Sequence, residues 1–226
     1  MRLFAVVVPP RGVIDHVTQL AAGVQPEWEP AAAPGEPGRH AAASSRLFSR
    51  RREQVAAPAR STGPMLDLLP AAHIHLPIAK LGGNIPLAEA ARVTTALQAQ
   101  AAEWESPRLN LQGGLALEPK GDDSVWVRLR GDLDALKAVA RGVSRVSQGL
   151  NLYVDRRAFR PELRLGTING RTTEAYLETL LTALDDYESP SWWQTTLLLI
   201  IPGEAGPDQV PYKVYSEIPL GPAVPH

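Results

Sequence analysis

Apolar and polar residues alternate along the stretch Ala72–Gly82, and this pattern predicts a β-strand. Successive side chains of a strand point to opposite faces, so residues two apart share a face. The apolar face carries Ile74, Leu76 and Ile78. His73 and His75 then lie next to each other on the other face. We expect the apolar face to be buried and the two histidines to face a site.

A second stretch, Phe159–Gly166, repeats this arrangement later in the chain. Leu163 and Leu165 are expected to point inward, while Glu162 and Arg164 share the outer face. Both stretches end in the dipeptide Leu-Gly. The repetition indicates two equivalent strands whose polar pairs belong to one site.

The remaining apolar pattern predicts further helices and strands. Apolar side chains recur at helical spacing over residues 11–22, 86–101, 132–150 and 177–184. Strands are predicted at residues 3–8, 108–117, 125–130, 193–201 and 210–218. Gly113 and Gly114 interrupt one of these strands, which indicates a β-bulge or kink. The order of helices and strands is typical of an α+β protein.

Residues 26–64 have a different character, because alanine, proline, glycine, serine and arginine dominate and no hydrophobic period emerges. We predict a long irregular insertion, which we expect to be mobile. Its basic cluster consists of Arg46, Arg50, Arg51 and Arg52. We interpret this cluster either as part of a solvated turn or short helix, which we favour, or as a phosphate-binding flap.

Composition narrows the class of protein. The chain has 226 residues, a formal net charge of −1 and no cysteine. This length suits one domain of two lobes with a sizeable core. Without cysteine, the chain has no disulfide, thiolate metal site or cysteine nucleophile. The near-neutral charge argues against a nucleic-acid binder that uses its whole surface, although it leaves room for a local basic cleft.

The sequence shows no pattern typical of a membrane span or a secretory signal. The apolar run around residues 196–201 is far shorter than the roughly 20 residues that cross a bilayer. The run Leu3–Val8 is too short for the apolar part of a signal peptide, and it stops at Pro9. Together with the lack of cysteine, these features lead us to expect a cytoplasmic protein. We also expect it to be a monomer.

The frame of the two Leu-Gly stretches resembles the 2H phosphoesterase superfamily, and within it the 2′-5′ RNA ligase and RNA 2′,3′-cyclic phosphodiesterase family. That family carries one His-x-Thr motif in each lobe, the first before Phe-Leu-Gly and the second after Phe-x-Pro. Here His73 matches the first histidine, and His75 stands where the first threonine belongs. Glu162 replaces the second histidine, and Arg164 replaces the second threonine. The likeness covers nearly the whole chain, beginning with the opening Met1–Pro10.

The resemblance implies a single bilobal domain over residues 1–226. It implies two pseudo-symmetric lobes of antiparallel sheet, with helices outside and a central cleft. In the family, two histidines flank a cyclic or diester phosphate, and one takes a proton while the other gives one. Histidine suits this exchange because its pKa lies near neutral pH. The neighbouring hydroxyls bind the non-bridging oxygens, where charge grows in the transition state.

Only one of the four motif positions keeps the family's residue, so the motifs are degenerate. Arg164 is interpreted as a phosphate ligand, which we favour, or as an ordinary surface arginine. Glu162 is interpreted either as a general acid or, as we favour, as part of an ion pair with a cleft arginine. We assign His73 and Glu162 to the catalytic positions, and His75 and Arg164 to phosphate binding.

A metal site is a further alternative, because two histidines and one carboxylate form a known facial ligand set. No additional ligand is evident in the sequence, so we predict neither a metal nor another cofactor. The predicted function is that of a 2′-5′ RNA ligase-like or cyclic phosphodiesterase-like protein. It would bind the phosphate of a nucleotide or an RNA end in the cleft, with weak or altered phosphodiester hydrolysis.

The alternative function is that of a catalytically inactive pseudoenzyme, which would act as a binding or interaction module. The two functions differ in what they require of the cleft. An open basic pocket, onto which His73 and Arg164 converge, favours ligand chemistry. A cleft plugged by a Glu162–Arg164 pair or by the inserted loop favours the interaction module.

Overall fold

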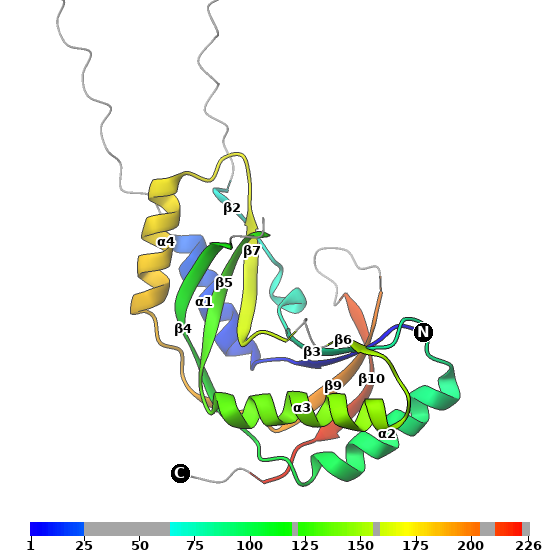
Figure 1. The fold of residues 1–226 in the computed structure, drawn as a ribbon. Helices are drawn as coiled ribbons and strands as arrows, with labels where there is room; N and C mark the ends of the chain where they lie inside the picture. The colour runs from blue at the N-terminus through cyan, green and yellow to red at the C-terminus, as the bar shows by residue number, and fades with distance from the viewer. Residues whose placement is uncertain (25–63, 119–121, 156–158, 204–210, 223–226) are drawn as a thin grey trace, which may run out of the picture.

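The computed structural model describes residues 1–24, 64–118, 122–155, 159–203 and 211–222. Within these residues the chain forms two antiparallel sheets and four α-helices, as Figure 1 shows. The predicted α+β class with two sheet lobes is confirmed. The predicted insertion at 26–64, with its arginine cluster, lies outside the described residues except for Pro64.

The first sheet, sheet A, contains β1 (Leu3–Val7), β3 (Leu76–Leu81), β6 (Val154–Asp155), β9 (Thr196–Pro202) and β10 (Tyr212–Pro219). Sheet B contains β2 (Leu66–Leu68), β4 (Arg108–Glu118), β5 (Asp122–Gly131), β7 (Glu162–Ile168) and β8 (Trp192–Trp193). The helices are α1 (Arg11–Gly23), α2 (Leu87–Ala101), α3 (Leu133–Gly149) and α4 (Glu174–Asp186), and a short 3-10 helix, η1 (Ala71–His73), precedes β3.

The strands run in the order β10-β9-β1-β3-β6 in sheet A and β2-β7-β5-β4-β8 in sheet B. Helices α2 and α3 pack against each other and against sheet A, while α4 covers β4 of sheet B and α1 contacts α4 (Figure 1). Each helix buries residues at helical spacing; in α3 these include Leu136, Val139 and Val143. No helix within the described ranges has the length and apolar character that a membrane crossing requires.

The predicted faces of the two Leu-Gly stretches are confirmed. The side chains of Ile74, Leu76 and Ile78 are almost fully buried, and those of Leu163 and Leu165 are completely buried. They belong to one apolar cluster with contributions from both sheets. The opposite faces of β3 and β7 are consequently the ones that remain for a site.

The first stretch is only partly a strand, because β3 starts at Leu76 instead of Ala72. His73 lies in η1, and the prediction of a strand at that residue was wrong. The amide of His73 donates to the carbonyl of Pro70 at 2.8 Å, and the amide of Ile74 donates to Ala71 at 3.3 Å. These turn bonds occupy backbone groups that a strand would use for its ladder.

The strand predicted over residues 193–201 is present from Thr196 as β9, but the stretch is not one continuous strand, because its first residue belongs to β8 of the other sheet. Trp192–Trp193 pairs with β4 in sheet B, and Thr196–Pro202 pairs with β1 and β10 in sheet A. Between them, the amide of Gln194 donates to the carbonyl of Pro107 at 2.9 Å. The chain therefore crosses from one lobe to the other within a few residues.

The hairpin of β4 and β5 is confirmed, together with its irregularity. The pairing register shifts between Leu111 and Gly114, and Gly113 has a φ of 92°. This left-handed backbone region favours glycine. The bulge predicted from the glycine pair is thus present.

The structure requires the glycines of the two Leu-Gly dipeptides for different physical reasons. Gly82 has a φ of 66°, where a side chain would be strained. Gly166 lies where β2 crosses closely, and a β-carbon there would lie 2.7 Å from the carbonyl oxygen of Asp67. This glycine within β7 therefore permits β2 to pair with the strand, from Leu66↔Ile168 to Leu68↔Gly166.

We expect Gly166→Ala to lower the free energy of unfolding by about 1–3 kcal/mol, because the added methyl overpacks a backbone contact. Gly170→Ala is the matched control, since a β-carbon there meets no atom within 4 Å. Urea denaturation of both variants measures the difference. Equal stability of the two variants would contradict the close approach of β2.

Candidate functional site

A pocket of about 300 Å³ lies where the two sheets face each other. We call it the cleft pocket, and its walls are Leu69, His73, His75, Pro77, Trp126, Arg164 and Pro211. Pro77 belongs to β3 of sheet A, and His75 lies between η1 and β3, whereas Trp126 and Arg164 belong to β5 and β7 of sheet B. Three of the four residues predicted for the site are therefore brought together from distant parts of the chain.

Arg164 supplies the positive charge of the cleft pocket. Its side chain is exposed, and its neighbour across the strands is Trp126. Its Nη2 donates to Thr167 Oγ1 at 2.9 Å, which orients the guanidinium along β7. Because a guanidinium has five N–H donors, this single bond leaves further donors for an anionic ligand.

His75 is held in a defined orientation and tautomer. Its Nδ1 lies 3.0 Å from the backbone carbonyl oxygen of His73, which can only accept a hydrogen bond. Nδ1 therefore carries the hydrogen, and Nε2 keeps its lone pair while the ring is neutral. The ring also meets Tyr212 edge-on, with centroids 5.5 Å apart and an interplanar angle of 79°.

The surroundings of His75 favour its neutral form. Burial lowers the pKa of His75 below its usual value of 6.5, and the charge of nearby His73 lowers it further, while the hydrogen bond to the His73 carbonyl opposes both effects. At neutral pH the ring is consequently suited to accept a proton or a hydrogen bond at Nε2. A neutral ring of this kind is a better base than acid.

Glu162, predicted at a catalytic position, does not line the cleft pocket. It is half-buried at the start of β7, and its neighbour across the strands is Arg128. It shares the strand face of Arg164, but the hydrogen bond of Arg164 goes to Thr167. The structure therefore brings His73, His75 and Arg164 together and leaves Glu162 beside the pocket.

Trp126 is a pocket residue that the sequence reasoning missed. The alternation of residues along β5 could have indicated it. Val125 and Val127 are buried on one face of the strand, so Trp126 must point to the other face. What the sequence could not supply is the register that sets Trp126 opposite Arg164. Its indole N–H is buried and has no acceptor among the described residues.

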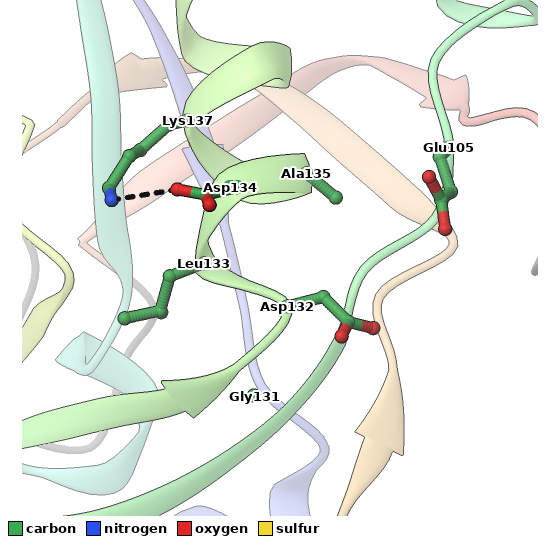
Figure 2. Close-up of a pocket in the computed structure, with 7 residues that line it drawn as sticks. All are labelled: Glu105, Gly131, Asp132, Leu133, Asp134, Ala135 and Lys137. Carbon is green, nitrogen blue, oxygen red and sulfur yellow. Dashed lines mark hydrogen bonds and ion pairs between the residues drawn. The ribbon is translucent and has the colours of Figure 1, made fainter. Parts of the chain in front are cut away.

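A larger hollow of about 540 Å³ lies at the start of α3, away from the cleft pocket. Figure 2 shows its walls, among which Asp132, Asp134 and Glu105 carry carboxylates. Asp134 pairs with Lys137 at 3.0 Å, and Asp132 accepts from the amide of Arg108. Such an acidic surface repels a phosphate. Across the described residues, no group of three His, Asp or Glu side chains is arranged to hold a metal ion.

No protein-family model and no curated protein sequence matches the chain. Solved structures match over nearly its whole length. TT0787 of Thermus thermophilus matches with a TM-score of 0.58 and 17% identity, covering 97% of this chain and 98% of that one. E. coli LigT complexed with 3′-AMP matches with a TM-score of 0.56 and 15% identity, covering 97% of each chain. A protein described as a phosphoesterase matches with a TM-score of 0.55 and 14% identity, covering 98% of each chain.

At such low sequence identity, structural likeness shows that the fold is shared. The chain thus has the fold of the 2H phosphoesterases, as its resemblance implied. Its activity and its site residues are proposals, which rest on the geometry of the cleft pocket.

We expect the ring protons of His75 to titrate, in an NMR experiment, with a midpoint below pH 6.5. Because the unfolded chain then takes up this proton more readily than the folded one, the contribution of His75 to stability is complete above pH 6.5. It is lost as the pH falls from there through the lower folded pKa. The free energy of unfolding should therefore fall more steeply on acidification in the natural protein than in His75→Gln. A midpoint at or above 6.5 would show that burial does not govern this ring.

Proposed function

We propose that this protein binds the phosphate group of a nucleotide or an RNA end in the cleft pocket. The observation that carries the proposal is that His75, directly before β3 of sheet A, and Arg164 on β7 of sheet B line one pocket. A guanidinium forms strong charge-assisted hydrogen bonds with phosphate oxygens. The structures of LigT complexed with 3′-AMP, ATP and phosphate support a ligand of this class.

The pocket supports only part of a phosphodiester hydrolysis. Nε2 of His75 can take the proton of an attacking water, and Arg164 can stabilise the charge that grows on the phosphate. The tautomer of His75 favours it, rather than His73, as this base. In the proposal the two histidines therefore exchange the roles that the sequence suggested, and His73 contributes to phosphate binding.

Among the wall residues that the structure describes, none supplies the general acid that protonates the leaving oxygen. Glu162 stands at the motif position for this role, but its neighbour is Arg128 and it does not line the pocket. We therefore propose that hydrolysis of a 2′,3′-cyclic phosphate is weak. The same observation favours the second candidate, an inactive module that binds a phosphate-bearing ligand without cleaving it.

We expect Arg164→Ala to weaken the binding of 3′-AMP by roughly 10- to 100-fold, because hydrogen bonds to charged groups contribute about 1.5–3 kcal/mol. Arg145→Ala is the matched control, since Arg145 is exposed on α3 and does not line the cleft pocket. Isothermal titration calorimetry on both variants and the natural protein measures the effect. If both variants bind as tightly as the natural protein, the cleft pocket is not the phosphate site.

We expect slow hydrolysis of 2′,3′-cyclic AMP, and a further loss of roughly 10²–10⁴-fold in His75→Gln, which removes the base. Glu162→Gln should change the rate much less, because Glu162 does not line the pocket. Product formation followed by chromatography measures all three rates. Binding without any turnover would favour the inactive module, and fast turnover that survives His75→Gln would mean that the chemistry lies elsewhere.

A further inference from the structure

A further pocket, of about 330 Å³, lies where α3 packs against β3. We call it the helix-side pocket, and its walls are Ile78 on β3, Phe159 and Pro161 before β7, and Lys137, Ala140, Arg141 and Ser144 on α3. Ile78 follows directly after Pro77, which lines the cleft pocket, so the two side chains point to opposite faces of β3. The helix-side pocket therefore lies on the face of sheet A that is turned away from the cleft pocket.

The floor of the helix-side pocket is apolar and belongs to the core. Ile78 is almost fully buried, and Phe159 is half-buried and packs against the main apolar cluster. The small side chain of Ala140 leaves space between α3 and these residues. The hydroxyl of Ser144 already donates to the carbonyl of Ala140 at 3.0 Å. The pocket volume falls within the range of about 300–1,000 Å³ that is typical of small-molecule sites, and these walls suit an aliphatic chain.

The charged side chains on the described walls are both cations, Lys137 and Arg141. They lie four residues apart on α3, so they share one face of the helix, with about 5–6 Å between their β-carbons. Lys137 pairs with Asp134 at 3.0 Å, whereas Arg141 forms no hydrogen bond or ion pair within the part of the chain that the structure describes. The guanidinium of Arg141 is therefore available to an anionic group at the edge of the pocket.

Asp134 shows how the two cations act on a carboxylate. Its pKa is lowered, chiefly by the hydrogen bond from Lys137 and then by the charges of Lys137 and Arg141. The Asp134 side chain is 96% exposed, and exposed ion pairs of this kind contribute little to stability. A carboxylate held at Arg141 can consequently share Lys137 with Asp134 at small cost.

We infer that the helix-side pocket binds a small amphipathic carboxylate, with its aliphatic chain against Ile78 and Phe159 and its head group at Arg141 and Lys137. A guanidinium can form two parallel hydrogen bonds with one carboxylate. The apolar walls remove the chain from water, which favours binding. The helix-side pocket shares no wall residue with the cleft pocket, so this inference goes beyond the proposed function and does not rest on it.

The test separates the head group of the ligand from its chain. Isothermal titration calorimetry of the full chain uses octanoate, butanoate and octylammonium, each below its micelle concentration. A methylene that leaves water contributes roughly fourfold in affinity, so we expect octanoate to bind at least about tenfold more tightly than butanoate. Octylammonium has the same chain with the opposite charge, and we expect it not to bind measurably.

Variants place the effect in the helix-side pocket. Arg141→Ala should weaken the binding of octanoate by roughly 10- to 100-fold. Arg145→Ala is the matched control and should leave the binding nearly unchanged, because Arg145 is exposed one turn further along α3 and does not line the pocket. Ala140→Leu should abolish binding by filling the pocket. If that variant does not unfold cooperatively, Phe159→Ala is a second route, and it should weaken octanoate more than butanoate.

The outcomes also separate this inference from the proposed function. No binding of octanoate to the natural protein, or equally tight binding of octylammonium, would overturn the inference. Octanoate binding that survives both Arg141→Ala and Ala140→Leu would place the ligand elsewhere. Saturating 3′-AMP should leave the affinity for octanoate unchanged, and competition between the two would contradict separate pockets. If octanoate binds as expected and 3′-AMP does not bind at all, the inference stands and the proposed function is wrong.

Discussion

The site depends on the burial of one face of β3 and one face of β7. Leu76 on β3 and Leu163 on β7 are completely buried, and each contributes about 1.5–3 kcal/mol when it leaves water. Because strand side chains alternate, this burial fixes which residues face the cleft. A shift of one residue in either strand would turn the polar side chains, such as Arg164, inward and expose the leucines. The hydrophobic core therefore determines the position of the polar groups.

His75 connects the core to the chemistry of the cleft. It follows directly after the buried Ile74. Its ring contacts the carbonyl oxygen of His73 through Nδ1 and forms a T-shaped pair with the ring of Tyr212. In a regular strand, the backbone carbonyl of His73 would accept a hydrogen bond from the neighbouring strand. Because His73 lies in the η1 turn, this carbonyl is directed towards the ring of His75 instead. The departure from strand geometry at His73 is thus part of what sets the tautomer of His75.

The sequence was sufficient for the parts of the structure that follow from local pattern. The buried faces of both Leu-Gly stretches, the β4–β5 bulge and the two-lobed α+β arrangement could all be predicted, the last with help from the resemblance. The crossing of the chain at Gln194 could not, because it depends on a backbone bond to the distant Pro107. Nor could the pairing of Trp126 with Arg164, since cross-strand register is a long-range property.

In the proposed site, arginine and glutamate stand where the resemblance expects a threonine and a histidine, and this difference affects catalysis more than binding. A guanidinium cannot be deprotonated in proteins, so Arg164 offers charge and hydrogen bonds but no proton. Its attraction acts on the bound phosphate as well as on the transition state. Interactions that stabilise both equally raise affinity without raising the rate of the chemical step. In the proposed site, His75 is the base, Arg164 is the anion ligand, and none of the wall residues that the structure describes carries a carboxylic acid. Such a pocket is better suited to holding a phosphate than to cleaving one.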